Sequence, residues 1–176
     1  MLDNCRPDLI VSRMEDLDQD DLWDRGIRGI VLDLDNTLCF WGGTEVSPGR
    51  RAWVERAKER FAVCILSNTY KSRRLRRVGE DLGLPALARW GLGRKPYRGG
   101  FRAALKLTGT RPEATVMIGD QVFADVLGGN RYGMLTVWVP KISAHEFIST
   151  RLVRGLERFV LRRLGCAIPA PPSEGT

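Results

Sequence analysis

Residues 29–37 of the chain read GIVLDLDNT, an apolar run that ends in two aspartates and a threonine. The apolar part, residues 29–34, predicts a short strand that is buried on both faces, as in a parallel sheet. Asp33 and Asp35 stand at its carboxyl end, and Thr37 follows two positions later. Two carboxylates this close repel each other unless a cation or a shared proton lies between them. The stretch therefore predicts both a central strand and a charged site.

Apolar runs and helical patterns alternate along the middle of the chain. Further strands are predicted at residues 62–67, 88–91, 115–119 and 134–139. Helices are predicted after the Ser47 and Pro48 pair and at residues 70–82, 99–107 and 122–132. Such alternation produces a parallel sheet with right-handed crossovers and helices on both faces. We therefore predict one α/β domain, a doubly wound parallel sheet, over residues 1–165, and a disordered proline-rich tail over residues 166–176.

Polar residues follow three of the predicted strands. Ser67 and Asn68 close the second strand, and Asp120 directly follows the fourth. In open α/β sheets, ligands bind beyond the carboxyl ends of the strands. These side chains are therefore expected to meet Asp33 and Asp35 at one edge of the sheet.

Acidic side chains are the most numerous at this predicted edge. Asp120 and Asp125 join Asp33 and Asp35, which brings four carboxylates together. Oxygen ligands of this kind suit a hard divalent cation, and magnesium is the natural choice. The single histidine of the sequence, His145, excludes a zinc or iron site built from several histidines.

A phosphoryl group beside the metal would need donors for its remaining charge. Ser67 offers a hydroxyl, and Lys95, in a GRKP turn, offers a point charge. Taken alone, each feature has a structural explanation: an aspartate caps a helix, a serine forms a turn, and a lysine is a solvated surface charge. Together and in this order, they favour a site for phosphoryl transfer.

Four segments of the chain carry a resemblance to a known family. They are DLDNT at 33–37, ILSN at 65–68, RKP at 94–96 and GDQVFAD at 119–125. In this order they resemble the four signatures of the haloacid dehalogenase (HAD) superfamily. The similarity extends over residues 6–165 to one branch of subclass IIIA, the phosphatidylglycerophosphate phosphatases. It implies a HAD-like Rossmannoid fold and hydrolysis of a lipid phosphate to phosphatidylglycerol.

By this resemblance, Asp33 is the nucleophile that forms a transient aspartyl-phosphate. Asp35 is the general acid for the leaving oxygen and then the general base for water, and its backbone carbonyl binds magnesium. Thr37 supports the turn and orients the acid. An aspartate at position 35 is typical of the phosphatases, because dehalogenases and P-type ATPases of the superfamily lack it.

The resemblance also implies how phosphate and metal are held. The expected phosphate-binding residues are Thr37, Ser67, Asn68 and Lys95. The expected ligands of the Mg²⁺ cofactor are Asp33, Asp35, Asp120 and Asp125.

No segment of the chain is long enough to hold a cap domain over this site. Residues 38–64 hold one loop and one helix, and the stretch between Ser67 and Lys95 holds a helix and a weak strand. A capless site suits a substrate that is large or presented on a surface, such as a lipid headgroup, a phosphoprotein or a nucleic-acid end, unless another subunit supplies the cap. The leading hypothesis is a magnesium-dependent phosphomonoester hydrolase acting on phosphatidylglycerophosphate.

Two other functions stay open. The same residues could serve a phosphatase for a soluble sugar or metabolite phosphate, and an oligomer would then close the site. A non-catalytic protein could use the site to sense a phosphorylated ligand, although the intact set of catalytic residues argues against this. Nucleic acid is not an expected partner, because no recognition motif accompanies the basic charge. The sequence leaves the oligomeric state open.

The formal net charge of +7 attracts anions to the surface. Basic residues concentrate at 71–77 (KSRRLRR), just after the second strand. Residues 151–164 predict an amphipathic helix, with Arg151, Arg154, Arg158 and Arg162 largely on one face. The opposite face is formed by Leu152, Val153, Leu156, Phe159, Val160 and Leu164. We expect that apolar face to pack on the domain, as most amphipathic helices do, in preference to lying on an anionic membrane.

Several features bear on the cellular location. No apolar run is long enough to span a bilayer, and residues 1–30 are polar and acidic, unlike a secretory signal. Cys5, Cys39, Cys64 and Cys166 lie far apart without a CxxC pair, which indicates reduced packing thiols. We expect a cytoplasmic protein that exposed arginines could recruit to the inner face of a membrane. Trp41 is expected either at the mouth of the site or in plain packing, and the acidic N-terminal stretch is expected to form a helix beside the first strand.

Overall fold

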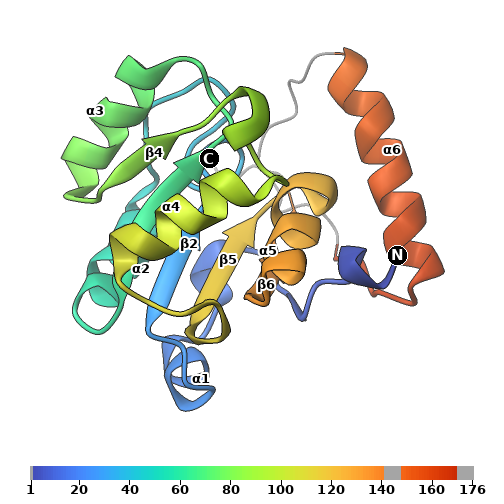
Figure 1. Cartoon of the computed structure of the whole chain (residues 1–176), viewed down its shortest axis with the longest axis horizontal. Coiled ribbons are helices and arrows are strands. Elements are labelled where there is room, and N and C mark those ends of the chain that lie inside the picture. The colour runs from blue at the N-terminus through green and yellow to red at the C-terminus, as the bar shows by residue number, and fades with distance from the viewer. Residues whose placement is uncertain (1, 141–147, 170–176) are drawn as a thin grey trace.

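A parallel sheet forms the centre of the computed structural model, which describes residues 2–140 and 148–169 (Figure 1). Its strands are β1 (Leu9–Ile10), β2 (Gly29–Leu32), β3 (Ala62–Ser67), β4 (Ala86–Ala88), β5 (Thr115–Gly119) and β6 (Leu135–Trp138). They lie in the order β1-β6-β5-β2-β3-β4, and all neighbouring pairs are parallel. The chain moves outward from β2 in one direction through β3 and β4, and in the other through β5 and β6. The carboxyl ends of β2 and β5 therefore form the crevice in which such folds bind ligands.

Helices cover both faces of this sheet. The helices of the described chain are α1 (Gln19–Asp24), α2 (Pro48–Lys58), α3 (Ser72–Leu82), α4 (Arg98–Thr108), α5 (Leu127–Tyr132) and α6 (Ile148–Arg163), of which α6 does not cover the sheet. Helices α1, α2 and α3 share one apolar core with the sheet, and α4 packs in a second core on the other face. Figure 1 shows α4 and α5 in front of the sheet and α6 standing apart at one side. The α/β fold with a doubly wound parallel sheet is thus confirmed.

The side chains of β2 show how the two cores are separated. All four residues of this strand are buried, and successive side chains of a strand point to opposite faces. Ile30 and Leu32 join the core under α1, α2 and α3, while Val31 joins the core under α4. On the second face, a Cβ atom at Gly128 would lie 2.4 Å from the ring of Phe101. A glycine at this position therefore lets α5 approach α4 closely.

Most predicted elements occur, with a few shifts. Strands β3 and β5 have the predicted bounds, and Ser47 caps α2 by accepting a hydrogen bond from the Arg50 N–H. The weak strand lies at Ala86–Ala88, slightly before the predicted position. The predicted helix at residues 122–132 begins as a π-helical turn, Val122–Val126, and only then continues as α5.

The N-terminal region differs more from the expectation. The helix predicted beside the first strand covers only Gln19–Asp24, and an unpredicted strand, β1, pairs with β6 at the sheet edge. The segment is anchored by apolar burial, because Met14, Leu17 and Leu22 enter the main core. In addition, the Trp53 indole donates a 2.8 Å hydrogen bond to the Leu17 carbonyl.

Helix α6 is present, but it does not bury the predicted apolar face. Val160 is buried, whereas Val153, Leu156 and Phe159 are exposed. The buried side instead carries Arg154 and Glu157, because they pair with polar groups at the carboxyl end of β5. The prediction that the apolar face packs on the domain is therefore wrong for most of the residues that can be compared.

Some expectations fall partly outside the described residues. His145 lies in segment 141–147, which is outside the described residues. The side chains of Arg151 and Leu152 are not among the described ones either. Residues 170–176 of the predicted tail lie outside it too, so disorder there stays a prediction. Before them, Cys166 and Ile168 pack against the apolar cluster around Val160. Among the described residues, no helix is both long and apolar enough to cross a membrane.

Candidate active site

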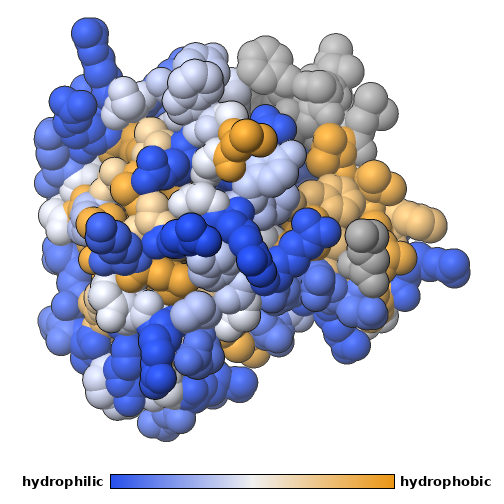
Figure 2. All heavy atoms as spheres, in the orientation of Figure 1, coloured by the Kyte–Doolittle hydropathy of each residue, from blue (hydrophilic) through white to orange (hydrophobic). Residues whose placement is uncertain are grey.

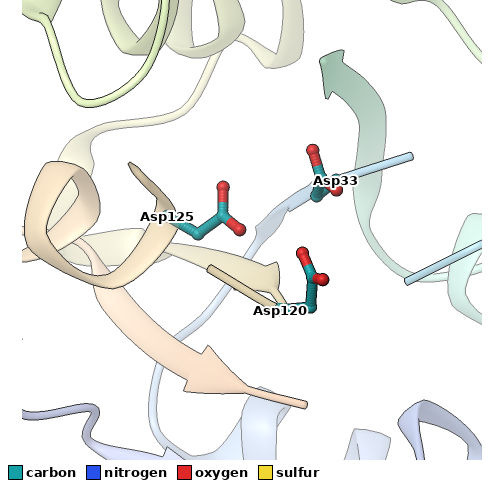
Figure 3. A group of neighbouring side chains, drawn as sticks. All are labelled: Asp33, Asp120 and Asp125. Atoms are coloured by element: carbon teal, nitrogen blue, oxygen red, sulfur yellow. The ribbon is translucent and has the colours of Figure 1, made fainter. Parts of the chain in front are cut away.

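Three buried aspartates meet at the carboxyl edge of the sheet (Figure 3). Asp33 follows β2, Asp120 follows β5, and Asp125 lies in the π-helical turn after β5. One carboxylate oxygen from each lies within 4.8 Å of the others. The predicted convergence of acidic side chains from separate strands is therefore present for these three residues.

Gly119 makes room for this cluster. A Cβ atom at this last residue of β5 would lie 2.2 Å from Asp125 Oδ2. The same Asp125 oxygen accepts a 3.0 Å hydrogen bond from the Gln121 N–H, which fixes the side chain inside the turn. The GDQVFAD segment therefore needs a glycine at position 119, because any side chain there would clash with the Asp125 carboxylate that lies over the end of the strand.

Lys95 supplies a buried positive charge between two of the carboxylates. Its ammonium nitrogen lies 2.5 Å from Asp33 Oδ1 and 2.7 Å from Asp125 Oδ1. Asn68 holds this residue in place, because its side chain donates to the Lys95 carbonyl at 2.8 Å and accepts from the Lys95 N–H at 2.7 Å. Asn68, expected to bind phosphate, is therefore bonded here to the backbone that positions the lysine.

The electrostatics of the site are those of crowded, buried acids. Burial raises the pKa of Asp33 to about 7, against the lowering effect of the Lys95 ammonium. Burial also raises the pKa of Asp120 well above its usual value, although the Arg154 guanidinium opposes this. For Lys95, burial alone would lower the pKa, but the carboxylates of Asp125 and Asp33 outweigh it and raise the pKa. The two carboxylates therefore favour the charged form of the lysine.

The donor set fits a divalent metal ion. Asp33 Oδ2 and Asp120 Oδ1 are buried and have no hydrogen-bond partner among the described residues. Buried polar atoms normally have such partners, and carboxylate oxygens are the preferred ligands of Mg²⁺. Asp33, Asp120 and Asp125 could therefore hold a magnesium ion.

Asp35 and Thr37 lie outside the group of Asp33, Asp120 and Asp125 and have other surroundings. The Asp35 carboxylate accepts from Arg74 Nη2 at 2.5 Å and from the Gly42 N–H at 2.9 Å. Asn36, which lies between Asp35 and Thr37, has a left-handed backbone conformation with φ +62°, and the chain turns sharply there after β2. Thr37 is buried with its hydroxyl unpartnered within the described chain, and Ser67 is buried at the end of β3. The Asp35 carboxylate is thus outside the group of three buried aspartates, and metal binding by its backbone carbonyl stays a prediction.

A cleft of about 240 Å³ opens beside Asp35. Its walls include Trp41, Asn68, Tyr70 and Arg74. Trp41 therefore lines a cleft beside Asp35, and its expected position at the mouth of the active site stays a prediction.

Two residues of the site could not be found from the sequence. Arg154 of α6 donates through Nη2 to Asp120 Oδ2 and through Nη1 to the Asp120 carbonyl. Glu157, one turn further, lies 3.2 Å from Arg154 Nη1 and accepts a 3.1 Å hydrogen bond from the Phe123 N–H. These bonds fix α6 to the segment that carries Asp120 and Asp125. In the sequence, an arginine and a glutamate three residues apart look like any surface helix pair.

Comparisons with known proteins show which family the chain is similar to. A family model described as HAD-hydrolase-like matches residues 92–142, and one described as mitochondrial PGP phosphatase matches residues 2–84. The probable phosphatase YqeG of Bacillus subtilis is 36% identical over 159 residues, which cover 90% of each chain. Phosphatidylglycerophosphate phosphatase 1 of Arabidopsis thaliana is 29% identical over 89% of this chain, which spans 47% of that relative.

A solved structure shows the same fold. The haloacid dehalogenase-like family hydrolase of Xanthomonas campestris aligns over 77% of this chain and 98% of its own, with a TM-score of 0.51 and 14% identity. The match to YqeG and the two family models, rather than this likeness of fold, show that the chain belongs to the HAD superfamily and is a phosphatase of that class. Within the superfamily, it resembles the phosphatidylglycerophosphate phosphatases.

The fit of Asp125 over Gly119 can be tested through metal binding. In Gly119→Ala, the added methyl group displaces the Asp125 carboxylate, so Mg²⁺ affinity should fall by about 10- to 100-fold. Calorimetric titration with MgCl₂ measures this without any substrate. Gly155→Ala, where a Cβ meets nothing within 4 Å, is the matched control and should bind as the wild type does. Unchanged affinity in Gly119→Ala would show that Asp125 does not take part in holding the ion.

The attachment of α6 can be tested through stability. Arg154→Met leaves the Asp120 and Glu157 carboxylates buried without their cation, and should lower the free energy of unfolding by about 3 kcal/mol. Urea unfolding of the chelator-treated protein measures the change. Arg158→Met removes an exposed arginine from the same helix and should cost about 0.5 kcal/mol or less. Equal losses in the two variants would contradict the buried contact.

Proposed function

We propose that the protein is a magnesium-dependent phosphatase that releases phosphate from phosphatidylglycerophosphate through an aspartyl-phosphate on Asp33. The observation that carries the proposal is the arrangement of Asp33, which is buried, paired with Lys95 and adjacent to two further carboxylates. The similarity to a phosphatidylglycerophosphate phosphatase over most of this chain supports the lipid as substrate.

The first chemical step makes the covalent intermediate. A carboxylate oxygen of Asp33 attacks the phosphorus, and the bond from phosphorus to the glycerol oxygen breaks. Asp35, beside the cleft, gives a proton to that leaving oxygen. In this scheme Lys95 and Ser67 hold the phosphoryl oxygens, and bound Mg²⁺ would offset the negative charge shared by the aspartates and the phosphoryl group.

The second step releases inorganic phosphate. The Asp35 carboxylate, now deprotonated, takes a proton from a water molecule whose oxygen attacks the phosphorus. The bond from phosphorus to the Asp33 oxygen breaks, and the free carboxylate is restored. Asn68 contributes indirectly in this scheme, because it holds the backbone of Lys95.

The uncovered site suits a lipid substrate at a membrane surface. The segments that follow β2 and β3 in the described chain add one helix each, α2 and α3, and do not add a cap domain. A headgroup can therefore reach the site while its acyl chains stay in the bilayer. The proposed location is the cytoplasmic face of a membrane, where basic side chains favour anionic lipid.

Loss of the nucleophile should abolish turnover. We expect Asp33→Asn to release no phosphate above background from vesicles that contain phosphatidylglycerophosphate and Mg²⁺, because an amide cannot form the phospho-enzyme. Asp24→Asn changes an exposed aspartate in the same way and should keep full activity. A panel of soluble phosphomonoesters is assayed beside the vesicles. Activity on the soluble esters alone would exclude the lipid assignment, and activity retained in Asp33→Asn would exclude the mechanism.

The two roles of Asp35 predict a kinetic signature. p-Nitrophenyl phosphate has a good leaving group that needs little protonation, so Asp35→Asn should still form the phospho-enzyme from it. Hydrolysis of that intermediate should slow by about 10²- to 10⁴-fold without the general base. Rapid-mixing absorbance should then show a burst of nitrophenol equal to the enzyme concentration. Steady turnover at the wild-type rate, without a burst, would rule out Asp35 as the base.

A further inference from the structure

Six large apolar or aromatic side chains are exposed in the loops that surround the site. They are Phe40, Trp41, Tyr70, Trp90, Leu92 and Tyr97, and we call them the apolar rim. Tyr70, Trp90 and Leu92 are 84%, 79% and 86% exposed. Exposed large apolar side chains gathered in one place indicate an interaction surface, whereas single ones are ordinary.

The apolar rim lies at the same edge of the sheet as Asp33. Its members belong to the loops that follow β2, β3 and β4, and all strands of the sheet are parallel. Two of them, Trp41 and Tyr70, line the cleft beside Asp35. Leu92 belongs to a 3-10 turn, Gly91–Gly93, that directly precedes the segment carrying Lys95. A partner bound to this rim therefore covers the active site.

Most of the charge around the apolar rim is positive, although Glu45 is exposed in the loop that follows β2. Residues 68–79 and 83–112 contain no aspartate or glutamate. Lys71, Arg73, Arg94 and Arg98 are exposed in or beside the rim loops. A surface of apolar tips with flanking cations fits an anionic bilayer, in which tyrosine and tryptophan lie at the headgroup level and arginine and lysine bind the lipid charge.

We propose that the apolar rim inserts into the headgroup layer of an anionic membrane and so brings a lipid phosphate to Asp33. This inference rests on the proposed function, since it names the surface through which that substrate arrives. A bilayer accounts for Leu92 better than a nucleic acid does, because leucine has no ring on which a base can stack. Figure 2 shows a second apolar area over α6, where Val153, Leu156 and Phe159 are exposed, but nothing in the structure shows what covers it.

The test separates membrane binding from catalysis. Flotation is measured with phosphatidylcholine vesicles, with and without phosphatidylglycerol, so no substrate is needed. The double variant Trp90→Ser with Leu92→Ser changes rim residues that lie outside the cleft beside Asp35. Its binding to anionic vesicles should fall by at least about tenfold, because two large side chains no longer leave water. Turnover of p-nitrophenyl phosphate should be unchanged, whereas turnover of phosphatidylglycerophosphate in vesicles should fall with binding.

The matched control is Leu107→Ser. Leu107 is an exposed leucine near the end of α4, just before the loop that enters the amino end of β5. It should bind vesicles as the wild type does. Equal binding by the rim variant and this control, or no binding of the wild type to anionic vesicles, would overturn the inference even if phosphatase activity is present. Displacement of the vesicles by single-stranded RNA, with the loss of RNA binding in the rim variant, would assign the rim to nucleic acid instead.

Discussion

The charge balance around Asp33 constrains the rest of the structure. Asp33, Asp120, Asp125 and Glu157 bring four buried carboxylates together, while Lys95 and Arg154 supply two cations. When all four acids are ionised, the excess is two negative charges, which a divalent ion would neutralise, and buried charges are tolerated only when paired. The ends of β2 and β5, the π-helical turn after β5, the segment before α4, and α6 each deliver an acid or a cation to this point. The short, fully buried strands β2 and β5 do this by ending at the same level.

This constraint also explains the orientation of α6. Considered alone, the helix would bury its apolar stripe, since that maximises the apolar area removed from water. In the fold, the carboxylate of Asp120 lies within reach of α6 and needs a cation, so Arg154 faces inward and Glu157 follows it. Val153, Leu156 and Phe159 are left in contact with solvent. A local pattern of hydrophobicity could not predict this, because the deciding charge lies 34 residues earlier in the chain.

Features that depend on a local sequence pattern could be predicted, whereas features that depend on contacts between distant segments could not. The bounds of β3 and β5 follow from runs of apolar residues, and the meeting of Asp33, Asp120 and Asp125 follows from strand ends in a parallel sheet. Contacts made between distant segments carry no local signal. The pairing of Arg74 with Asp35 is one example, and the bonds between Asn68 and the backbone of Lys95 are another. The π-helical turn that carries Asp125 could not be predicted from the sequence either, because a helix that begins with a π-helical turn has the same hydrophobic pattern as a regular α-helix.

No cap domain covers the site among the described residues, so bulk water must be excluded from it by other means. Asp33 and Lys95 are buried, but Asp35 lines a cleft whose walls include the exposed aromatic side chains of Trp41 and Tyr70. Water in that cleft would weaken the electrostatic interactions on which phosphoryl transfer depends. If the substrate belongs to a membrane, the headgroup layer itself closes the cleft when the apolar rim is inserted. Water would then leave the cleft only when the protein is bound to the membrane that holds its substrate. The membrane would thus do the work of a cap domain.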